Sequence, residues 1–324
     1  MLFRSWWIKS QGGRLALEAR DVPVPQPGPG EVVVHVRAAA LNRGEFNPRY
    51  LPDGGEKIGG HEAAGEVTAV GDGVIYVKNG DRVMGRARGG FSEYAVMQEF
   101  EAMRMPDRLS WEQAAGVPLV FLVTYDMLVR HGRLQAEDWL LVTAVSSGVG
   151  VACMQTAQLL GAKVIGTSGS QDKLDRLLHI GLNAGIATRK ADFAGRVKEL
   201  TGGKGANVIV NNVGGSVFGE CLRSLAYQGR FATVSTVDEV TKCEIDVAQL
   251  HANRWELFGA SNRFVTQEMR RVVVRNFVRD ILPGIGAGRV VPLVDSVFEF
   301  SQLPAARDRM LANMQTGKII LLAP

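Results

Sequence analysis

Cysteines and long apolar runs are scarce in this sequence of 324 residues. Its three cysteines, Cys153, Cys221 and Cys243, have neither the spacing of a metal motif nor the density of a disulfide framework. They fit a reducing compartment, and a cytoplasmic protein is expected. No stretch reaches ~18 uninterrupted apolar residues, so no membrane-spanning helix is predicted. Residues 1–9 are too short and become polar too soon for a signal peptide.

Blocks of charge are missing as well. The chain has 37 basic and 33 acidic residues, a net charge of +4, and the basic residues are scattered along it. This pattern gives weak support for an anionic small-molecule ligand and argues against a nucleic-acid partner. Hydrophobic residues at 46% and charged residues at 22% are typical of a soluble globular protein. The length predicts about two domains.

The first hundred residues have mostly β patterns. Their segments are a proline-studded loop at 21–30, strands at 32–37 and 65–71, and a tight turn leading into a strand at 80–85. Helical patterning begins after Ser110, where Gln113 completes a capping-box signature. The final strand, 318–322, is expected to return to this N-terminal domain, because the short strands there need a partner.

From about residue 119, β and α patterns alternate, as they do in a doubly wound parallel sheet. Strands are predicted at 139–144, 163–167, 207–213 and 230–234. Helices are predicted at 149–160, 171–180, 190–201, 215–226, 263–283 and 301–315. The expected fold class is therefore α/β, with a mostly-β domain and a doubly wound domain.

The turn at 146–150 is the main candidate for a ligand site, with the residues Ser146, Ser147, Gly148, Val149 and Gly150. An apolar strand pattern enters this turn and a helical pattern leaves it, so backbone N–H groups at the helix start can bind an anion. The pattern G-x-G-x-x-G would have glycine at Ala144 or Val145 and at Ser147. Small residues still let a phosphate approach the backbone closely. A dinucleotide site is favoured, and the alternative is a purely structural turn.

The residues after the predicted strand 163–167 discriminate between NAD and NADP as the cofactor. An NAD site has an acidic residue about 20 residues after the turn, which binds the ribose 2′-OH. Here Ser168 and Lys173 occupy that stretch, and they suit a 2′-phosphate. Asp172 comes late and fits the first turn of a helix equally well. NADPH is therefore the predicted cofactor. Arg189 could add a second positive charge, or it is a solvated loop residue.

Several ordered motifs lie at 59–67, 80–85, 114–118, 146–150, 159–167 and 212–215. Together they resemble the medium-chain dehydrogenase/reductase superfamily, in its zinc-free NADPH quinone oxidoreductase-like branch. The resemblance covers nearly the whole chain. It implies a GroES-like domain formed by 1–118 with 264–324, and a Rossmann domain formed by 119–263. It also implies a homodimer.

The resemblance further implies roles for single residues. The positions that match cofactor-binding positions of the family are Asn42, Thr124, Ser168, Lys173, Asn212, Gly214, Gly259 and Ser261. Asn42 and Thr124 match residues near the nicotinamide and are the candidate catalytic residues together with Tyr50. Tyr50 lies near where related enoyl reductases place a tyrosine, and it is a candidate proton donor. The alternative donor is bulk water.

His61, in the motif Gly60-His61-Glu62, matches a metal ligand of the zinc-dependent relatives. A catalytic zinc needs about three protein ligands. The N-terminal domain has no cysteine, and Asn42 stands where the family has a cysteine ligand. We therefore expect no metal, and we expect His61 to be a hydrogen-bonded structural residue.

The expected reaction follows from this site. Alcohol oxidation in the zinc-dependent relatives uses a Lewis acid to stabilise an alkoxide. Hydride delivery from NADPH to a quinone or an α,β-unsaturated carbonyl needs only correct positioning and a few hydrogen bonds. The nearest alternative is an enoyl-thioester reductase. A different alternative is a non-catalytic NADPH-binding protein of the same fold.

Overall fold

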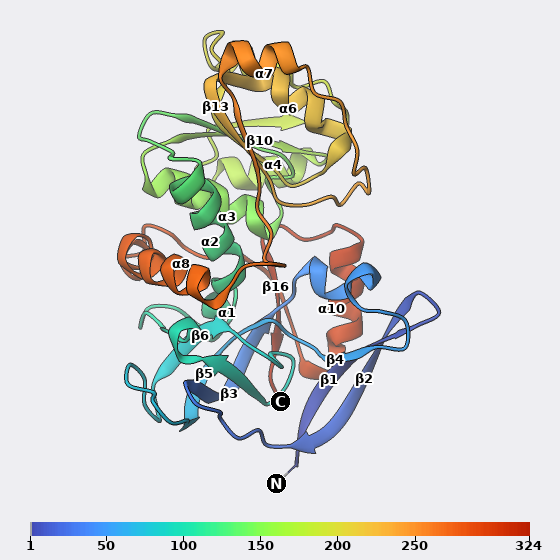
Figure 1. Ribbon diagram of the computed structural model, residues 1–324, viewed down its shortest axis with the longest axis vertical. Coiled ribbons are helices and arrows are strands. Elements are labelled where there is room, and N and C mark those ends of the chain that lie inside the picture. The colour runs from blue at the N-terminus through green and yellow to red at the C-terminus, as the bar shows by residue number, and fades with distance from the viewer. Residues whose placement is uncertain (1) are drawn as a thin grey trace. The chain divides into compact units, whose positions relative to one another are not determined.

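The computed structural model describes residues 2–324 and divides the chain into two compact units. The first unit contains the chain up to Val120 together with Glu268–Pro324, and the second contains Phe121–Gln267. In Figure 1 the first unit is therefore drawn in blue to blue-green and in dark orange to red, and the second in green to light orange. No helix within residues 2–324 has both the length and the apolar character needed to cross a membrane.

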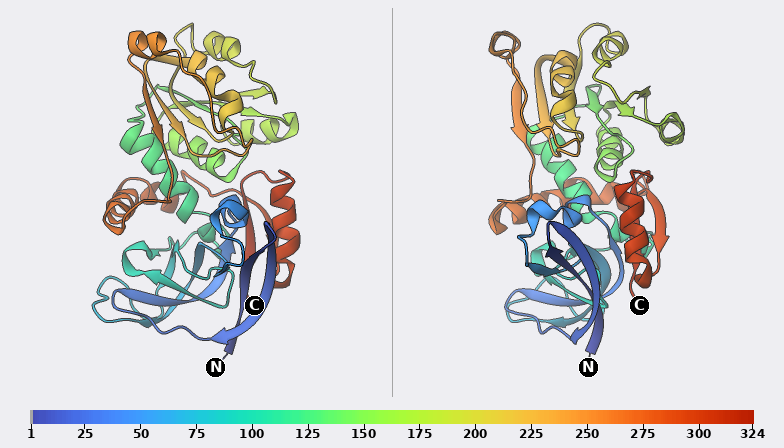
Figure 2. Two further views of the ribbon diagram at one scale, coloured as in Figure 1. Left: turned by 45° about the vertical axis from the view of Figure 1, so that its right-hand side comes forward. Right: turned by 90° about the vertical axis from the view of Figure 1, so that its right-hand side faces the viewer.

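The first unit is built on two sheets. A three-stranded antiparallel sheet has the order β2-β1-β4, with β1 (Leu2–Gln11), β2 (Arg14–Pro23) and β4 (Glu56–Ile58). Its β1 and β2 form the long twisted ribbon seen in Figure 2. Strand β2 continues to Pro23, so the predicted loop at 21–30 begins too early. Proline is tolerated at Pro23 because β2 is an edge strand and ends at that residue.

The second sheet of this unit has seven strands. Its order is β15-β16-β3-β5-β6-β8, and β7 also pairs with β3. The strands are β3 (Glu31–Ala40), β5 (Glu62–Val70), β6 (Arg82–Arg86), β7 (Tyr94–Gln98), β8 (Met103–Arg104), β15 (Val294–Phe298) and β16 (Lys318–Leu322). Strand β16 pairs antiparallel with β3, so Ile320 lies opposite Ala40. The predicted return of the last strand to the N-terminal strands is confirmed.

Two helices of the first unit, Trp111–Ala115 and Leu303–Leu311, pack against this sheet. The helices of this unit are α1 (Trp111–Ala115), α8 (Gln267–Asp280), α9 (Leu282–Gly286) and α10 (Leu303–Leu311). The predicted capping box is present at α1, where Ser110 accepts from the backbone of Gln113. The predicted helix 263–283 divides in two, because Pro283 cannot continue the hydrogen bonding of α8 and instead occupies the first turn of α9.

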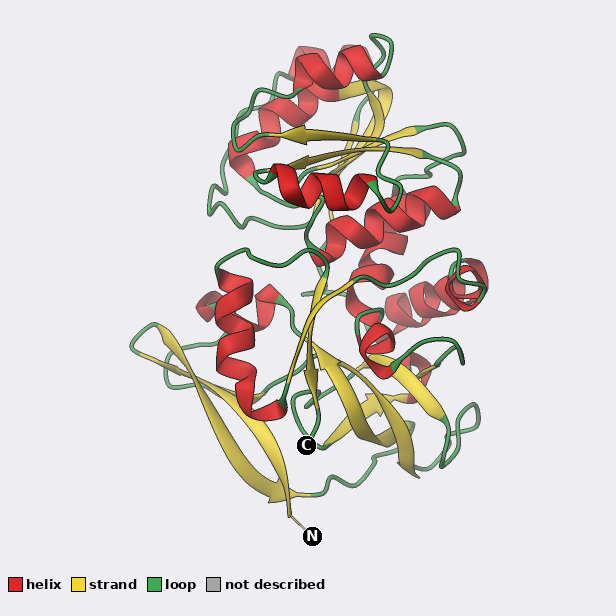
Figure 3. Cartoon of the chain, turned by 180° about the vertical axis from the view of Figure 1, so that it is seen from behind, coloured by secondary structure: helices red, strands yellow, loops and turns green. Residues whose placement is uncertain are grey.

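The second unit contains a six-stranded parallel sheet in the order β11-β10-β9-β12-β13-β14. The strands are β9 (Trp139–Val142), β10 (Lys163–Ser168), β11 (Ala184–Ala187), β12 (Ala206–Asn211), β13 (Leu225–Thr233) and β14 (Glu256–Gly259). Figure 3 shows helices on both sides of this sheet. The strand order reverses between β9 and β12, where doubly wound sheets bind ligands. The predicted α/β class is confirmed.

The helices of the second unit follow the predicted alternation, with shifted ends. They are α2 (Pro118–Tyr125, which contains the boundary at Val120), α3 (Gly148–Leu159), α4 (Gln171–Leu178), α5 (Ala194–Leu200), α6 (Phe218–Ser224) and α7 (Val247–Asn253). The predicted helix 215–226 ends at Ser224, because Leu225 begins β13 and pairs with Ala206. Strands β11 and β14 were not predicted.

Candidate active site

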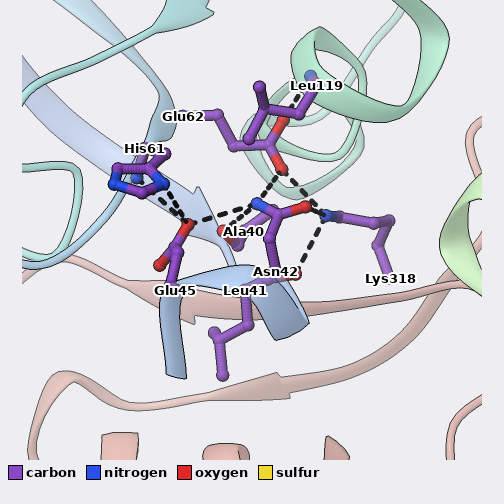
Figure 4. Close-up of polar contacts among 8 residues, drawn as sticks. All are labelled: Ala40, Leu41, Asn42, Glu45, His61, Glu62, Leu119 and Lys318. Carbon is purple, nitrogen blue, oxygen red and sulfur yellow. Dashed lines mark hydrogen bonds and ion pairs between the residues drawn. The ribbon is translucent and has the colours of Figure 1, made fainter. Parts of the chain in front are cut away.

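A polar cluster surrounds Asn42 in the first unit (Figure 4). Asn42 lies between β3 and the short helix Arg43–Phe46, while Glu62 begins β5 and Lys318 begins β16. The Asn42 side-chain amide donates to Glu62 Oε1 at 2.8 Å. Lys318 Nζ donates to Asn42 Oδ1 and to Glu62 Oε1, both at 2.8 Å. We call Asn42, Glu45, His61, Glu62 and Lys318 the Asn42 cluster.

The Glu62–Lys318 ion pair is buried and fully hydrogen-bonded. Lys318 uses its third N–H on the carbonyl oxygen of Leu41 at 2.9 Å. The second carboxylate oxygen of Glu62 accepts from the backbone N–H of Leu119 at 2.7 Å. Both side chains are buried. Because both ends of the Asn42 carboxamide are held by this pair, its orientation is fixed.

Glu45 is the member of the cluster without a cation of its own. Its Oε1 accepts from the backbone N–H of His61 at 3.2 Å and from the Asn42 amide at 3.3 Å. Its Oε2 is buried and has no partner within residues 2–324. Burial raises the pKa of Glu45 to about 8. The Glu62 carboxylate also raises this pKa, whereas the hydrogen bond from Asn42 lowers it. Burial therefore favours the neutral form of Glu45.

His61 stands beside this acid and is partly open to solvent. Its Nδ1 lies 3.7 Å from Glu45 Oε1, and its side chain is 44% exposed. Desolvation and the nearby cations Lys57 and Arg86 lower the pKa of His61 to about 4, so the imidazole is neutral at pH 7. The expectation of a hydrogen-bonded His61 holds for its backbone N–H, whereas the imidazole is beyond hydrogen-bond distance of Glu45. Within residues 2–324 no three His, Cys, Asp or Glu side chains form a group that could hold a metal ion.

The predicted anion-binding turn precedes α3 in the second unit. Ser147 caps the helix by accepting from the backbone N–H of Gly150 at 3.0 Å. A Cβ atom at Gly150 would lie 2.5 Å from the carbonyl oxygen of Val145, so glycine is required there. The N–H groups of Gly148 and Val149 open the helix, where donors have no intrahelical partner. This donor set fits a pyrophosphate, while Ser146 is buried at the base of the turn.

Ala144, two residues after β9, has a φ of +49°. This is the left-handed region that glycine enters freely and alanine enters at a cost. Ala144 stands where the sequence pattern has a glycine. The backbone at Ala144 still has the conformation that is typical of glycine.

The residues predicted to bind a 2′-phosphate lie together at the end of β10. Ser168 is the last residue of β10, and Ser170 caps α4 by accepting from the backbone N–H of Lys173 at 3.4 Å. Arg189 lies against the next residue of this loop, because a Cβ atom at Gly169 would be 2.8 Å from Arg189 Cζ. The hydroxyls and the guanidinium fit a phosphate monoester.

Thr124 and Asn212 turn toward protein partners. Thr124 is fully buried, and its hydroxyl lies 3.4 Å from the sulfur of Cys153, whose pKa burial raises to about 12. Asn212 is buried, with its side-chain amide on the carbonyl oxygen of Thr143 at 3.0 Å. The cofactor roles of both residues stay predictions.

Gly214 is also covered by protein. It has a φ of +138°, and a Cβ atom there would lie 1.9 Å from Asp238 Oδ1. Asp238 accepts from the backbone N–H of Ser216 at 2.8 Å and of Val240 at 3.0 Å, which ties the loop after β13 to the loop after β12. The cofactor role of Gly214 stays a prediction, and nothing in the sequence pattern singled out Asp238.

Tyr50, Gly259 and Ser261 are the more exposed candidates. Tyr50 is 57% exposed on the short helix Pro48–Tyr50. Gly259 ends β14 with open space around it, and Ser261 Oγ accepts from the backbone N–H of Arg263 at 3.2 Å. A cavity of about 630 Å³ elsewhere in the second unit contains none of the predicted residues; its lining includes Lys198, Arg223, Asp246 and Trp255.

Two family models match the chain. Residues 28–107 match the alcohol dehydrogenase GroES-like domain, and residues 148–278 match the zinc-binding dehydrogenase family. The chain belongs to the medium-chain dehydrogenase/reductase superfamily. The first match confirms the GroES-like expectation for the mostly-β unit.

Individual relatives are similar over nearly the whole chain. Human quinone oxidoreductase is 26% identical, with 99% of this chain and 98% of that protein aligned. A mycocerosic acid synthase-like polyketide synthase of Mycobacterium tuberculosis is 28% identical over 98% of this chain, which spans 15% of that much longer protein. A mycobacterial structure complexed with NADPH is 26% identical, with a TM-score of 0.88 and 99% of each chain covered.

Proposed function

We propose that this protein is an NADPH-dependent oxidoreductase that transfers a hydride to a quinone or an α,β-unsaturated carbonyl. The observation that carries the proposal is the packing of the Arg189 side chain against Gly169, the residue that follows Ser168 at the end of β10. An NAD site would have an acidic residue there. Similarity to human quinone oxidoreductase and to an NADPH-bound mycobacterial structure supports the same assignment.

The chain's own residues would act in binding and positioning. The N–H groups of Gly148 and Val149 would hold the pyrophosphate, and Ser168, Lys173 and Arg189 would hold the 2′-phosphate. When bound, NADPH supplies the hydride. Asn42, held in one orientation by Glu62 and Lys318, offers a fixed dipole at the acceptor site.

A second candidate acceptor is an enoyl thioester. The alignment of this chain with a segment of a polyketide synthase favours it. A panel of quinones, enones, enals and enoyl thioesters, scored by NADPH oxidation, separates these acceptors. No turnover of any acceptor, combined with tight NADPH binding, would instead favour a non-catalytic NADPH-binding protein.

The cofactor assignment is tested with Arg189→Ala. Loss of a charge-assisted hydrogen bond worth roughly 1.5–3 kcal/mol should weaken NADPH binding by about 10- to 100-fold and leave NADH binding unchanged. Tryptophan fluorescence quenching measures both affinities, and Lys173→Ala tests the second cation in the same way. Equal affinity of the unsubstituted protein for NADPH and NADH would refute the 2′-phosphate site.

We also propose that the protein acts on a small molecule as a homodimer in the cytoplasm, without nucleic-acid or membrane partners. Light scattering on the purified protein tests the oligomeric state.

A further inference from the structure

The guanidinium of Arg189 is an exposed cation that no group of the described chain engages. Within residues 2–324 it donates no hydrogen bond and forms no ion pair. A guanidinium has five N–H donors and keeps its charge at every physiological pH. An exposed arginine without partners samples many rotamers, and binding must then order it at an entropic cost. A ligand therefore gains most from Arg189 if the protein holds that side chain in place beforehand.

Gly169 is the residue against which the Arg189 side chain packs. A Cβ atom at Gly169 would lie 2.7 Å from both Cγ and Nε of Arg189 and 2.8 Å from its Cζ. Real Cβ atoms essentially never approach other heavy atoms so closely. The Arg189 side chain thus occupies the space that a side chain at position 169 would fill.

Hydrogen bonds fix the backbone on both sides of this contact. Strands β10 and β11 pair in parallel, and the backbone N–H of Thr188 donates to the carbonyl oxygen of Ser168 at 2.9 Å. The Thr188 hydroxyl donates to Asp192 Oδ1 at 2.6 Å, which closes the turn that contains Arg189. A clash at Gly169 is therefore relieved most easily by movement of the flexible Arg189 side chain.

The groups that fit a 2′-phosphate come from two separate segments of the chain. Ser168 ends β10 and Lys173 lies in the first turn of α4, whereas Arg189 follows β11. The contact at Gly169 is what brings the guanidinium over the first segment. Hydrogen bonds weaken steeply when the donor points away from the acceptor. A guanidinium displaced from Gly169 would therefore bind the same phosphate less well.

We propose that Gly169 determines cofactor specificity, because its missing side chain lets Arg189 lie over the loop after β10 and face the 2′-phosphate of NADPH. The inference rests on the proposed function and adds a residue to it. Gly169 is a positioning residue, since it acts through Arg189. NADH has no 2′-phosphate, so its binding does not depend on where Arg189 lies.

Gly169→Ala tests the proposal because it adds one methyl group and no charge. The backbone at Gly169 lies outside the left-handed region, so alanine can adopt its conformation. The variant should fold with an unchanged melting temperature. Its affinity for NADPH should fall about 10-fold, within the range expected for a misdirected charge-assisted hydrogen bond, while its affinity for NADH stays the same. Tryptophan fluorescence quenching measures both affinities.

A double variant shows whether Gly169 acts through Arg189. Replacements of two residues in contact have non-additive effects when one acts through the other. Gly169→Ala should weaken NADPH binding about 10-fold when Arg189 is present and should have no effect in the Arg189→Ala background. Arg189→Ala and the double variant should therefore bind NADPH with equal dissociation constants.

Gly195→Ala is the matched control. Gly195 lies on α5 of the same unit, and a Cβ atom there would meet nothing within 4 Å. The same added methyl group should leave the affinities for NADPH and NADH at the values of the unsubstituted protein. A loss of NADPH affinity confined to Gly169→Ala then comes from the contact with Arg189.

The outcomes separate this inference from the proposed function. If the unsubstituted protein binds NADPH and NADH equally, the proposed 2′-phosphate site fails, and the role of Gly169 fails with it. If Arg189→Ala loses the preference for NADPH but Gly169→Ala keeps it, only the role of Gly169 is refuted. An equal loss of NADPH and NADH affinity in Gly169→Ala would also overturn it, as would a loss of NADPH affinity that persists in the Arg189→Ala background.

Discussion

Burial of a neutral Glu45 should make the stability of this protein depend on pH in a defined way. The pKa of Glu45 is about 8 in the folded state, against 4.5 for an ordinary glutamate. Between these values the folded protein holds a proton at Glu45 that the unfolded chain has lost. Unfolding then releases a proton, so the free energy of unfolding falls as pH rises.

The magnitude follows from the two pKa values. One extra bound proton changes the free energy of unfolding by about 1.4 kcal/mol for each pH unit. From about pH 5 to about pH 7.5, the unsubstituted protein should therefore lose about 3 kcal/mol from this group alone. The contribution is fully present below the unfolded pKa of 4.5 and is lost as pH rises through about 8.

Glu45→Gln removes the ionisation and keeps the packing. Urea unfolding of both proteins at several pH values, analysed as the difference between them, isolates this group from all other titrations. As pH rises, the free energy of unfolding of Glu45→Gln should increase relative to that of the unsubstituted protein by about 1.4 kcal/mol per pH unit. Parallel stability curves for the two proteins would refute the assignment of Glu45 as a buried neutral acid.

Two further stability predictions follow from the described geometry. Lys318→Met leaves the buried Glu62 without its cation and should cost about 3–5 kcal/mol in urea unfolding; a loss below about 1 kcal/mol would contradict the buried ion pair. Adding Glu62→Gln to that variant should recover part of the loss, because the uncompensated charge is gone. Ala144→Gly relieves a left-handed residue and should raise the unfolding free energy by up to about 1 kcal/mol, measured by thermal unfolding. A lower melting temperature for Ala144→Gly would show that its φ of +49° carries little strain.

The sequence predicts well those features that local patterns encode. The alternation of β and α segments predicts the doubly wound unit, and Ser110 with Gln113 predicts the start of α1. Local hydrophobic period and capping chemistry carry this information. Strand β11 carries no such pattern, because three of its four residues are alanine or glycine, which are uncommon in strands.

The candidate site is predicted only in part for the same reason. Asn42 was found through its match to a family position, but Lys318, which orients it, is 276 residues away and has no local signal. Glu45 lies only three residues after Asn42, yet the rise of its pKa depends on burial and on the neighbours that tertiary structure brings to it. The contact of the Thr124 hydroxyl with Cys153 likewise has no local signal, and the cofactor role of Thr124 stays a prediction.

The position of Lys318 in the chain determines when the Asn42 cluster can form during translation. The second unit, Phe121–Gln267, is continuous and can complete its sheet as soon as it has left the ribosome. Glu62 and Asn42 emerge before it, but their cation, Lys318, lies 256 and 276 residues further along the chain and emerges only after the second unit. Until then Glu62 has to stay hydrated, because a lone charge is too costly to bury. The Asn42 cluster can thus form only after the whole second unit has been synthesised.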